Sequence, residues 1–318
     1  MRQIVVQSGN IFGPSCRLAD GEYVVGPAPM SIDEGMALLH ETGFDGIDFN
    51  INNFLAAVQI KSGRVGGFFT LPEKDMLEIL RPYKEAAKRY GLRFAQAHAP
   101  FPNYGPTPEM QDFVQEAVKT TIRLCDYLEC PNLVVHGRTR PYEDGMMTRE
   151  EEREANMAMY SSFIPVLKQY GVTCCLENLF LRHRGRKMEG FCADPHTACA
   201  YVDDLNALAG AECFGFCVDT GHINLLCMDL YSFIKSLGKR VKVLHVHDND
   251  GLEDEHLFPY MGIIDWDRFC QALREIDYQG DLSFETFRAL GLSDPALTPS
   301  LLRLLMDIGK LLRQKIDG

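Results

Sequence analysis

Short apolar runs alternate with longer amphipathic runs along most of the chain, and this alternation most constrains the fold. Eight short β-rich runs can be recognised, and between them apolar residues recur with helical spacing. Strands of near-continuous apolar character that alternate with helices indicate a parallel sheet covered by helices. The strand-like runs are Ile4–Gln7, Gly46–Phe49, Arg93–His98, Leu133–His136, Thr173–Glu177, Gly215–Asp219, Lys242–His247 and Leu282–Glu285.

Each strand-like run is followed by one helical segment. Two of these segments have a capping residue before a proline, Asp194 before Pro195 and Thr298 before Pro299. The helical segments are Ile32–Glu41, Glu73–Tyr90, Pro108–Leu128, Arg149–Tyr170, Pro195–Ala209, Asp229–Leu237, Asp267–Ile276 and Pro299–Arg313. Eight such units in 318 residues fit a closed barrel better than an open doubly wound sheet. We therefore expect an α/β protein in which residues 1–318 form a single-domain (β/α)8 TIM barrel.

Charge and composition exclude several classes of function. The formal net charge is -12 and the isoelectric point is near 5.2, which opposes binding to nucleic acid because that binding depends on basic residues. Neither a signal peptide nor an apolar run long enough to span a bilayer is recognisable. We expect a cytoplasmic protein with no membrane or nucleic-acid partner, and a homo-oligomer remains open.

Side chains that bind metals stand at the carboxyl ends of the expected strands and in the loops that follow. In a TIM barrel these ends converge on one rim, where the active site lies. The residues are His98, His136, Glu177, Asp219, His222, His247, Asp254, His256 and Glu285. One histidine at a strand end is more often structural than a ligand, but their joint placement at one rim favours a metal-centred active site.

Four of these residues make a sufficient ligand set for one divalent ion: Glu177, Asp219, His247 and Glu285. Mixed carboxylate and imidazole ligands suit Mn, Mg, Fe, Co or Zn and do not choose sharply among them. The alternative is a group of buried residues paired with Lys or Arg. No basic residue lies within these strand ends, and unpaired buried carboxylates are costly, so the metal site is favoured.

The motifs HAPF, VVHG, LEN, VDTGH, HVHDND, DEH and SFET, in this order, resemble those of the xylose-isomerase-like TIM barrels. That superfamily includes sugar phosphate isomerases and epimerases, ketose 3-epimerases, inosose dehydratases and endonuclease IV. The resemblance implies that Glu177, Asp219, His247 and Glu285 hold one ion. It also implies that Glu177 and Glu285 act as acid and base and that His222 contacts a substrate oxygen. The implied activity is metal-dependent isomerisation or epimerisation of a sugar, sugar acid or sugar phosphate through an enediolate. From their places at the strand ends we also expect His98 and His136 to contact the substrate.

Two segments depart from the ketose 3-epimerase pattern. This chain reads LFLRHRG where those enzymes carry a second Glu, and DNDGLE where they carry an Arg. These two departures disfavour epimerisation of a free ketose at C3. The first of these segments overlaps the basic run RHRGRK, so Arg182, Arg184 and Arg186 could bind an anionic sugar. A solvated surface loop is the alternative.

A second resemblance, to endonuclease IV, concerns the number of metals. That enzyme holds three zinc ions, and His98, His136, His222, Asp254 and His256 here have the residue types of its additional ligands. One ion is expected, and up to three remain possible, in which case a phosphoester hydrolase is the alternative function. A barrel that binds metal and ligand without turnover is a third possibility. The acidic charge favours the sugar isomerase or epimerase.

Overall fold

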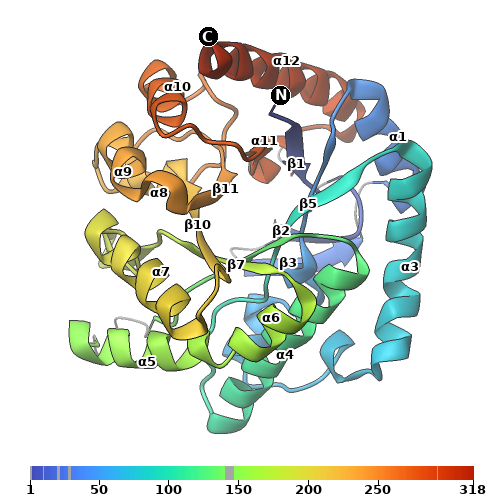
Figure 1. The fold of residues 1–318 in the computed structure, drawn as a ribbon. Coiled ribbons are helices and arrows are strands. Elements are labelled where there is room, and N and C mark those ends of the chain that lie inside the picture. Colours follow the sequence, from blue (N-terminus) through green and yellow to red (C-terminus); the bar gives the residue numbers. More distant parts are fainter. Residues whose placement is uncertain (1, 10, 20–21, 28–29, 140–146, 292) are drawn as a thin grey trace.

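Eight parallel strands form the centre of the molecule, in the order β11-β10-β7-β6-β5-β4-β1-β12 (Figure 1). The computed structural model describes residues 2–9, 11–19, 22–27, 30–139, 147–291 and 293–318. The strands are β1 (Ile4–Gln7), β4 (Gly46–Phe49), β5 (Arg93–His98), β6 (Asn132–Val135), β7 (Thr173–Glu177), β10 (Phe214–Asp219), β11 (Val241–His245) and β12 (Leu282–Phe284). A parallel bridge between Val246 and Phe284 joins the two ends of the sheet. The predicted TIM barrel is therefore confirmed, with the sheet nearly closed.

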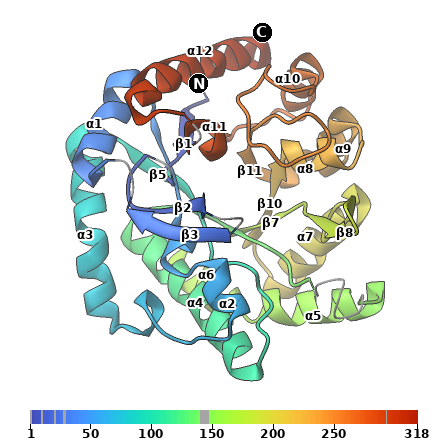
Figure 2. The same ribbon diagram turned by 180° about the vertical axis from the view of Figure 1, so that it is seen from behind.

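Helices surround this sheet on the outside (Figures 1 and 2). The α-helices are α1 (Ile32–Thr42), α2 (Ala57–Lys61), α3 (Glu73–Tyr90), α4 (Pro108–Tyr127), α5 (Arg149–Ser161), α6 (Ile164–Tyr170), α7 (Pro195–Ala209), α8 (Thr220–Leu225), α9 (Leu230–Leu237), α10 (Trp266–Glu275), α11 (Phe287–Gly291) and α12 (Thr298–Asp317). Short 3-10 helices are η1 (Ile51–Phe54), η2 (Phe68–Thr70), η4 (Gly238–Arg240) and η5 (Pro295–Leu297). Within the described ranges, no helix is long and apolar enough to cross a membrane.

The prediction of a single helix over residues 149–170 is wrong, because two helices lie in this segment. α5 ends at Ser161 and α6 begins at Ile164. Pro165 lies in the first turn of α6, where its missing N–H costs nothing, whereas inside a continuous helix it would remove a hydrogen bond. The proline therefore separates the two helices.

Two β-hairpins were not predicted. One consists of β2 (Pro14–Ala19) and β3 (Glu22–Pro27), and the other of β8 (Phe180–His183) and β9 (Arg186–Glu189). The second contains the basic run, which sequence analysis treated as a loop. Arg184 and Gly185 connect its strands with φ angles of 47° and 75°, as a two-residue turn with positive φ at both positions requires. Both hairpins follow barrel strands at the carboxyl side of the sheet.

Candidate active site

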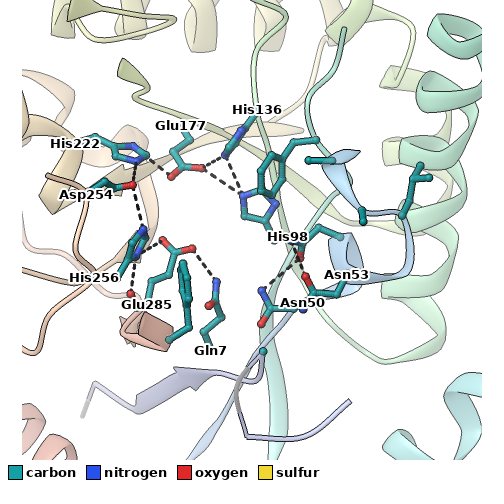
Figure 3. A pocket seen from close by; sticks show the side chains of 17 residues that line it. Gln7, Asn50, Asn53, His98, His136, Glu177, His222, Asp254, His256 and Glu285 are labelled. Atoms are coloured by element: carbon teal, nitrogen blue, oxygen red, sulfur yellow. Dashed lines mark hydrogen bonds and ion pairs between the residues drawn. The ribbon is translucent and has the colours of Figure 1, made fainter. Parts of the chain in front are cut away.

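A cavity of about 250 Å³ opens at the carboxyl ends of the strands (Figure 3). It brings together seven residues that the sequence placed at the rim: His98, His136, Glu177, His222, Asp254, His256 and Glu285. Asp219 and His247 do not line it but lie directly beside these residues. His247 Nε2 lies 3.0 Å from both Asp219 oxygens, and its ring stacks on that of His256 at 4.0 Å. All nine residues thus form one cluster.

Period-two alternation explains how the strands present these side chains. Val134, Cys175, Cys217 and Val243 form a small buried apolar cluster that is separate from the main core. Side chains two residues apart on a strand share a face. The residues two positions nearer the carboxyl ends are His136, Glu177, Asp219 and His245. On each of these strands, an apolar side chain is therefore followed two residues later by a polar side chain at the rim.

The VDTGH segment joins β10 directly to α8. Asp219 caps α8 by accepting a 2.7 Å hydrogen bond from the His222 N–H, so a single residue ends the strand and starts the helix. A Cβ on Gly221 would lie 2.0 Å from Cε1 of His247. Only glycine allows this approach of the imidazole to the backbone, which brings His247 against Asp219.

Glu177 is buried at the centre of the imidazoles. Its Oε2 lies 3.0 Å from His136 Nε2, and its Oε1 lies 3.0 Å from His245 Nδ1. Burial alone would raise the pKa of the Glu177 carboxyl, but His245 and His136 outweigh it and hold the pKa well below its usual range. Glu177 is therefore an anion at neutral pH.

Glu285 follows β12 on another side of the cavity (Figure 3). Gln7, at the end of β1, donates a 2.7 Å hydrogen bond to its Oε1. His245 Nδ1 lies 3.2 Å from its Oε2. Gln7 was not predicted as a site residue, although its position at a strand end could have indicated it. The carboxylate is held at two points and keeps access to the cavity.

Asp254 and His256 come from the loop after β11. His256 Nε2 lies 3.2 Å from Asp254 Oδ2, and His222 Nε2 lies 3.8 Å from the same oxygen. Burial would raise the pKa of Asp254, but His256 and His222 hold it well below its usual range. Burial would lower the pKa of His256, but Asp254 and Glu285 raise it to about 9. Asp254 and His256 thus place a further carboxylate and a further imidazole at the rim.

His245 was not among the expected ligands, yet it belongs to the same cluster. One candidate set for a metal ion consists of Glu177, Asp219, His245 and Glu285, whose ligand atoms lie within 4.8 Å of one another. His247 belongs to an adjoining set with His256 and Glu285. Two imidazoles, those of His245 and His247, therefore lie beside the three carboxylates of Glu177, Asp219 and Glu285. His245 stands two residues before His247 in the sequence, so both side chains face the same side of the strand. This spacing could have indicated His245.

The cluster fits a divalent ion. It combines carboxylates with imidazoles, the mixture that such ions accept, and His247 Nδ1 is buried with no hydrogen-bond partner. A third set, made by His98, His136 and Glu177, has the same 4.8 Å spacing. The buried His, Glu and Asp clusters therefore indicate a metal site, while the choice of ligands remains a prediction.

The three arginines of the basic run do not line the cavity. Arg182, Arg184 and Arg186 are exposed on the β8–β9 hairpin. Arg182 forms a 2.8 Å ion pair with Glu253, which Lys187 also contacts at 2.7 Å. Their role in substrate binding remains a prediction that the described cavity does not support.

Amide side chains form a wall that sequence analysis missed. Asn50, Asn52 and Asn53 line the cavity from the segment after β4, and Figure 3 shows Asn50 and Asn53 opposite His222 and Asp254. Asn50 Nδ2 donates to Asn52 Oδ1 at 3.3 Å, and Asn52 Nδ2 donates to Asn53 Oδ1 at 3.4 Å. Apolar lining comes from Leu55, Ala56, Ala57, Phe101 and Phe287. None of the described lining residues is Lys or Arg.

Residues 36–308 match the family model described as "Xylose isomerase-like TIM barrel". The chain belongs to this family. The predicted resemblance is therefore confirmed, and the family covers most of the barrel, including every residue of the cluster described above.

Curated relatives of this xylose isomerase-like barrel are distant or match short stretches. The uncharacterized protein y4fM of Sinorhizobium fredii is 39% identical over 72 residues, 23% of each chain. Inosose isomerase of Bacillus velezensis is 25% identical over 146 residues, 44% of this chain and 49% of the relative. The chain thus spans about half or less of these two relatives.

Solved structures match over nearly the whole chain. A D-psicose 3-epimerase solved in the presence of D-fructose has a TM-score of 0.70 at 13% identity and covers 99% of this chain and 100% of its own. The IOLI protein with a bound zinc atom has a TM-score of 0.66 at 16% identity and covers 99% and 98%. At these identities the structural likeness shows the fold.

Proposed function

We propose that this barrel is a divalent-metal-dependent isomerase or epimerase that acts on a sugar. The observation that carries the proposal is a pair of candidate metal sets that share Glu285, Glu177–Asp219–His245–Glu285 and His247–His256–Glu285, beside a cavity sized for a small molecule. The sugar isomerases and epimerases among its relatives support the same class of reaction.

Two carboxylates are available for proton transfer at a carbon next to a carbonyl group. Glu177 and Glu285 both line the cavity and come from different strand ends (Figure 3), so in this proposal they act on the substrate from different sides. One removes the proton and the other returns it, and the substrate passes through an enediolate. The ion, held by Glu177, Asp219, His247 and Glu285, would supply Lewis-acid polarisation of the substrate oxygens. His222 would contact a substrate oxygen.

The lining supports an uncharged polyhydroxy substrate over a sugar acid or a sugar phosphate. An amide offers two N–H donors and two acceptor lone pairs, which suits hydroxyl groups that both donate and accept. A phosphate instead favours Arg or Lys, and neither lines the cavity within the described residues. The phenyl rings of Phe101 and Phe287 offer apolar surface for the C–H face of a sugar ring.

A phosphoester hydrolase with several metals is the second candidate. The sets His98–His136–Glu177 and His247–His256–Glu285 favour it, because they provide ligands for further ions beside the first. Two or three ions would suit cleavage by a bridging hydroxide. The net charge of -12 opposes a nucleic-acid substrate.

Metal stoichiometry and solvent exchange together test these proposals. The protein would be loaded with Mn²⁺, Co²⁺ or Zn²⁺, dialysed and analysed for metal per chain. It would then be incubated in D₂O with free ketoses, cyclic polyhydroxy ketones and their phosphate esters. One ion and deuterium next to the carbonyl of an uncharged product are expected. Conversion without any solvent label would contradict the proton-transfer mechanism, and two or three ions with phosphoester cleavage would favour the hydrolase.

A further inference from the structure

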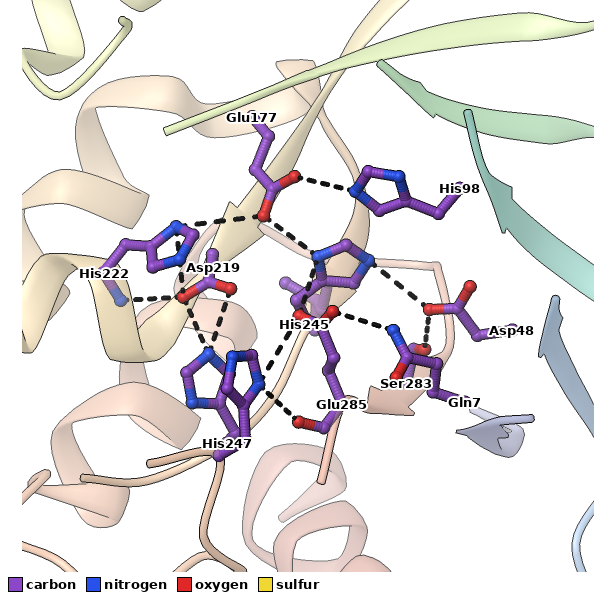
Figure 4. Close-up of polar contacts among 12 residues, drawn as sticks. Gln7, Asp48, His98, Glu177, Asp219, His222, His245, His247, Ser283 and Glu285 are labelled. Carbon is purple, nitrogen blue, oxygen red and sulfur yellow. Dashed lines mark hydrogen bonds and ion pairs between the residues drawn. The ribbon is translucent and has the colours of Figure 1, made fainter. Parts of the chain in front are cut away.

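A buried imidazole lies between the carboxylates of the candidate active site and another carboxylate deeper in the barrel. His245 Nδ1 lies 3.0 Å from Glu177 Oε1 and 3.2 Å from Glu285 Oε2. On the other side of the ring, Nε2 lies 3.4 Å from Asp48 Oδ2. His245 and Asp48 are both fully buried and do not line the cavity. Figure 4 shows the imidazole between the three carboxylates.

Asp48 is fixed by neighbours from other strands. Its Oδ2 accepts hydrogen bonds from Gln96 Nε2 at 2.8 Å and from Ser283 Oγ at 3.2 Å. Gln96 Nε2 also donates to the Leu244 carbonyl, directly before His245, at 3.2 Å. Asp48 is on β4 and His245 on β11, which are not neighbours in the sheet. The contact therefore crosses the barrel interior, and hydrogen bonds fix both of its ends.

Stability alone does not explain this arrangement. A buried ion pair recovers its desolvation cost only with complete hydrogen bonding, and apolar residues of similar volume are often as stable. Asp48 Oδ1 has no hydrogen-bond partner, so the pair is incompletely satisfied. Residues that hydrogen-bond to the ligands of a metal commonly fix the orientation of those ligands and tune their affinity.

We propose that His245, supported by Asp48, is a positioning residue that sets the direction and separation of the Glu177 and Glu285 carboxylates. It acts on metal binding and proton transfer through these carboxylates, without contacting the substrate. The consequence for turnover rests on the proposed function, whereas the consequence for metal affinity does not. Both imidazole nitrogens of His245 lie near carboxylate oxygens, Nδ1 at 3.0 Å from Glu177 and Nε2 at 3.4 Å from Asp48, although Nε2, like Nδ1 of His247, makes no hydrogen bond.

A matched pair of substitutions separates the two sides of the ring. In His245→Asn, the amide nitrogen falls near the position of Nδ1 and keeps a donor for Glu177 and Glu285. In His245→Gln, the longer amide falls near the position of Nε2 and keeps only the contact with Asp48. Asp48→Asn removes the charge behind the imidazole with little change of shape. His196→Gln, at an exposed position on α7, is the control.

Mn²⁺ affinity would be measured calorimetrically without substrate, together with kcat, KM and Tm for every variant. We expect His245→Gln to lose roughly 10- to 100-fold in Mn²⁺ affinity and kcat, and KM to change much less. His245→Asn should lose roughly threefold, and Asp48→Asn roughly tenfold, by the same loss of orientation. The control should match the unmodified chain.

Three results would overturn the inference. The first is equal loss of Mn²⁺ affinity and kcat in His245→Asn and His245→Gln, in proportion to their loss of Tm. The second is unchanged Mn²⁺ affinity and kcat in both variants, and the last is complete loss of Mn²⁺ binding in both. The last would make His245 a ligand. If His245→Gln does not fold, Asp48→Asn carries the test. If no sugar is converted by the unmodified chain, the proposed function fails, and the Mn²⁺ affinities still decide the positioning role.

Discussion

Two neighbouring layers inside the barrel come from the same strands and have opposite chemistry. The apolar layer consists of Val134, Cys175, Cys217 and Val243. The polar layer, two residues nearer the carboxyl ends, consists of His136, Glu177, Asp219 and His245. The apolar layer fills space, with a weak 4.0 Å hydrogen bond from Cys175 Sγ to the Thr173 carbonyl, whereas the polar layer places carboxylates and imidazoles about 3 Å apart. Strand periodicity therefore separates the part that stabilises the barrel from the part that binds and reacts.

Substitutions only two residues apart on one strand are therefore expected to have different effects. A change in the apolar layer should alter the free energy of unfolding and spare metal binding. A change in the polar layer should alter metal binding and turnover far more than a change in the apolar layer does.

The largest expected effect is on turnover. Glu177→Gln and Glu285→Gln each keep the side-chain shape but remove the proton-transfer group, so kcat should fall by about 10²- to 10⁴-fold. Steady-state kinetics on the converted sugar, with circular dichroism for the fold, would measure this. Glu212→Gln, an exposed glutamate before β10, is the matched control. Near-normal kcat in either variant would remove that glutamate from the proposed mechanism.

Metal removal should have the next largest effect, on thermal stability. An ion that binds only the folded chain adds about 2.7 kcal/mol at 100 times its Kd. In a chain of 318 residues that corresponds to a rise in Tm of roughly 4 °C over the chelator-treated protein. Calorimetry with and without Mn²⁺ would measure the rise, and Asp219→Asn should reduce it. An identical rise in Asp219→Asn would place the ion elsewhere.

A smaller effect is expected from the apolar layer. Val134→Ala should lower the free energy of unfolding by about 1–2 kcal/mol, because it leaves a small cavity in a packed interior. Denaturant unfolding measures this change. Mn²⁺ affinity and kcat should stay within twofold of the unmodified chain. A loss of Mn²⁺ affinity as large as that of Asp219→Asn would mean that the two layers are not separable.

Much of the fold was predictable because strand and helix periods are local signals. The bounds of Gly46–Phe49, Arg93–His98 and Thr173–Glu177 agree with the structure, as do those of α3 and α7. Hairpins such as β8–β9 were missed, since their charged residues resemble a loop and their pairing depends on a turn with positive φ at Arg184 and Gly185.

The candidate site was predictable where one residue at a strand end sufficed. All nine rim residues gather in one cluster, as the parallel sheet requires. Gln7, the asparagines after β4 and His245 were missed, because their importance depends on contacts across the barrel. The ion pair between Arg182 and Glu253 joins residues that are distant in sequence, so the exposed position of Arg182 could not be deduced from the basic run.

The smallest expected effect concerns a carboxylate outside both layers. Glu275 on α10 contacts Lys235 Nζ at 2.9 Å and accepts a hydrogen bond from the Tyr231 hydroxyl at 2.7 Å. Lys235, Tyr231 and Gln271 lower the pKa of Glu275 from 4.5 to about 2. The folded state therefore gains stability from this carboxylate above about pH 4.5 and loses it as the pH falls toward 2.

Tm measurements of the unmodified chain and Glu275→Gln between pH 7 and pH 2.5 would show this. The unmodified chain should have the higher Tm at pH 7, by a small margin because the pair is partly exposed, and the margin should shrink toward pH 2.5. If the difference in Tm between the two proteins does not depend on pH, Glu275 contributes through packing and not through its charge.

Anomalous scattering from crystals grown with Zn²⁺ tests the central claim most directly, because it locates the ion without reference to any substrate. The account predicts one strong peak at the base of the cavity, with carboxylate oxygens of Glu177, Asp219 and Glu285 at about 2.0–2.2 Å. Peaks only at surface groups, or no peak among these three carboxylates, would contradict it.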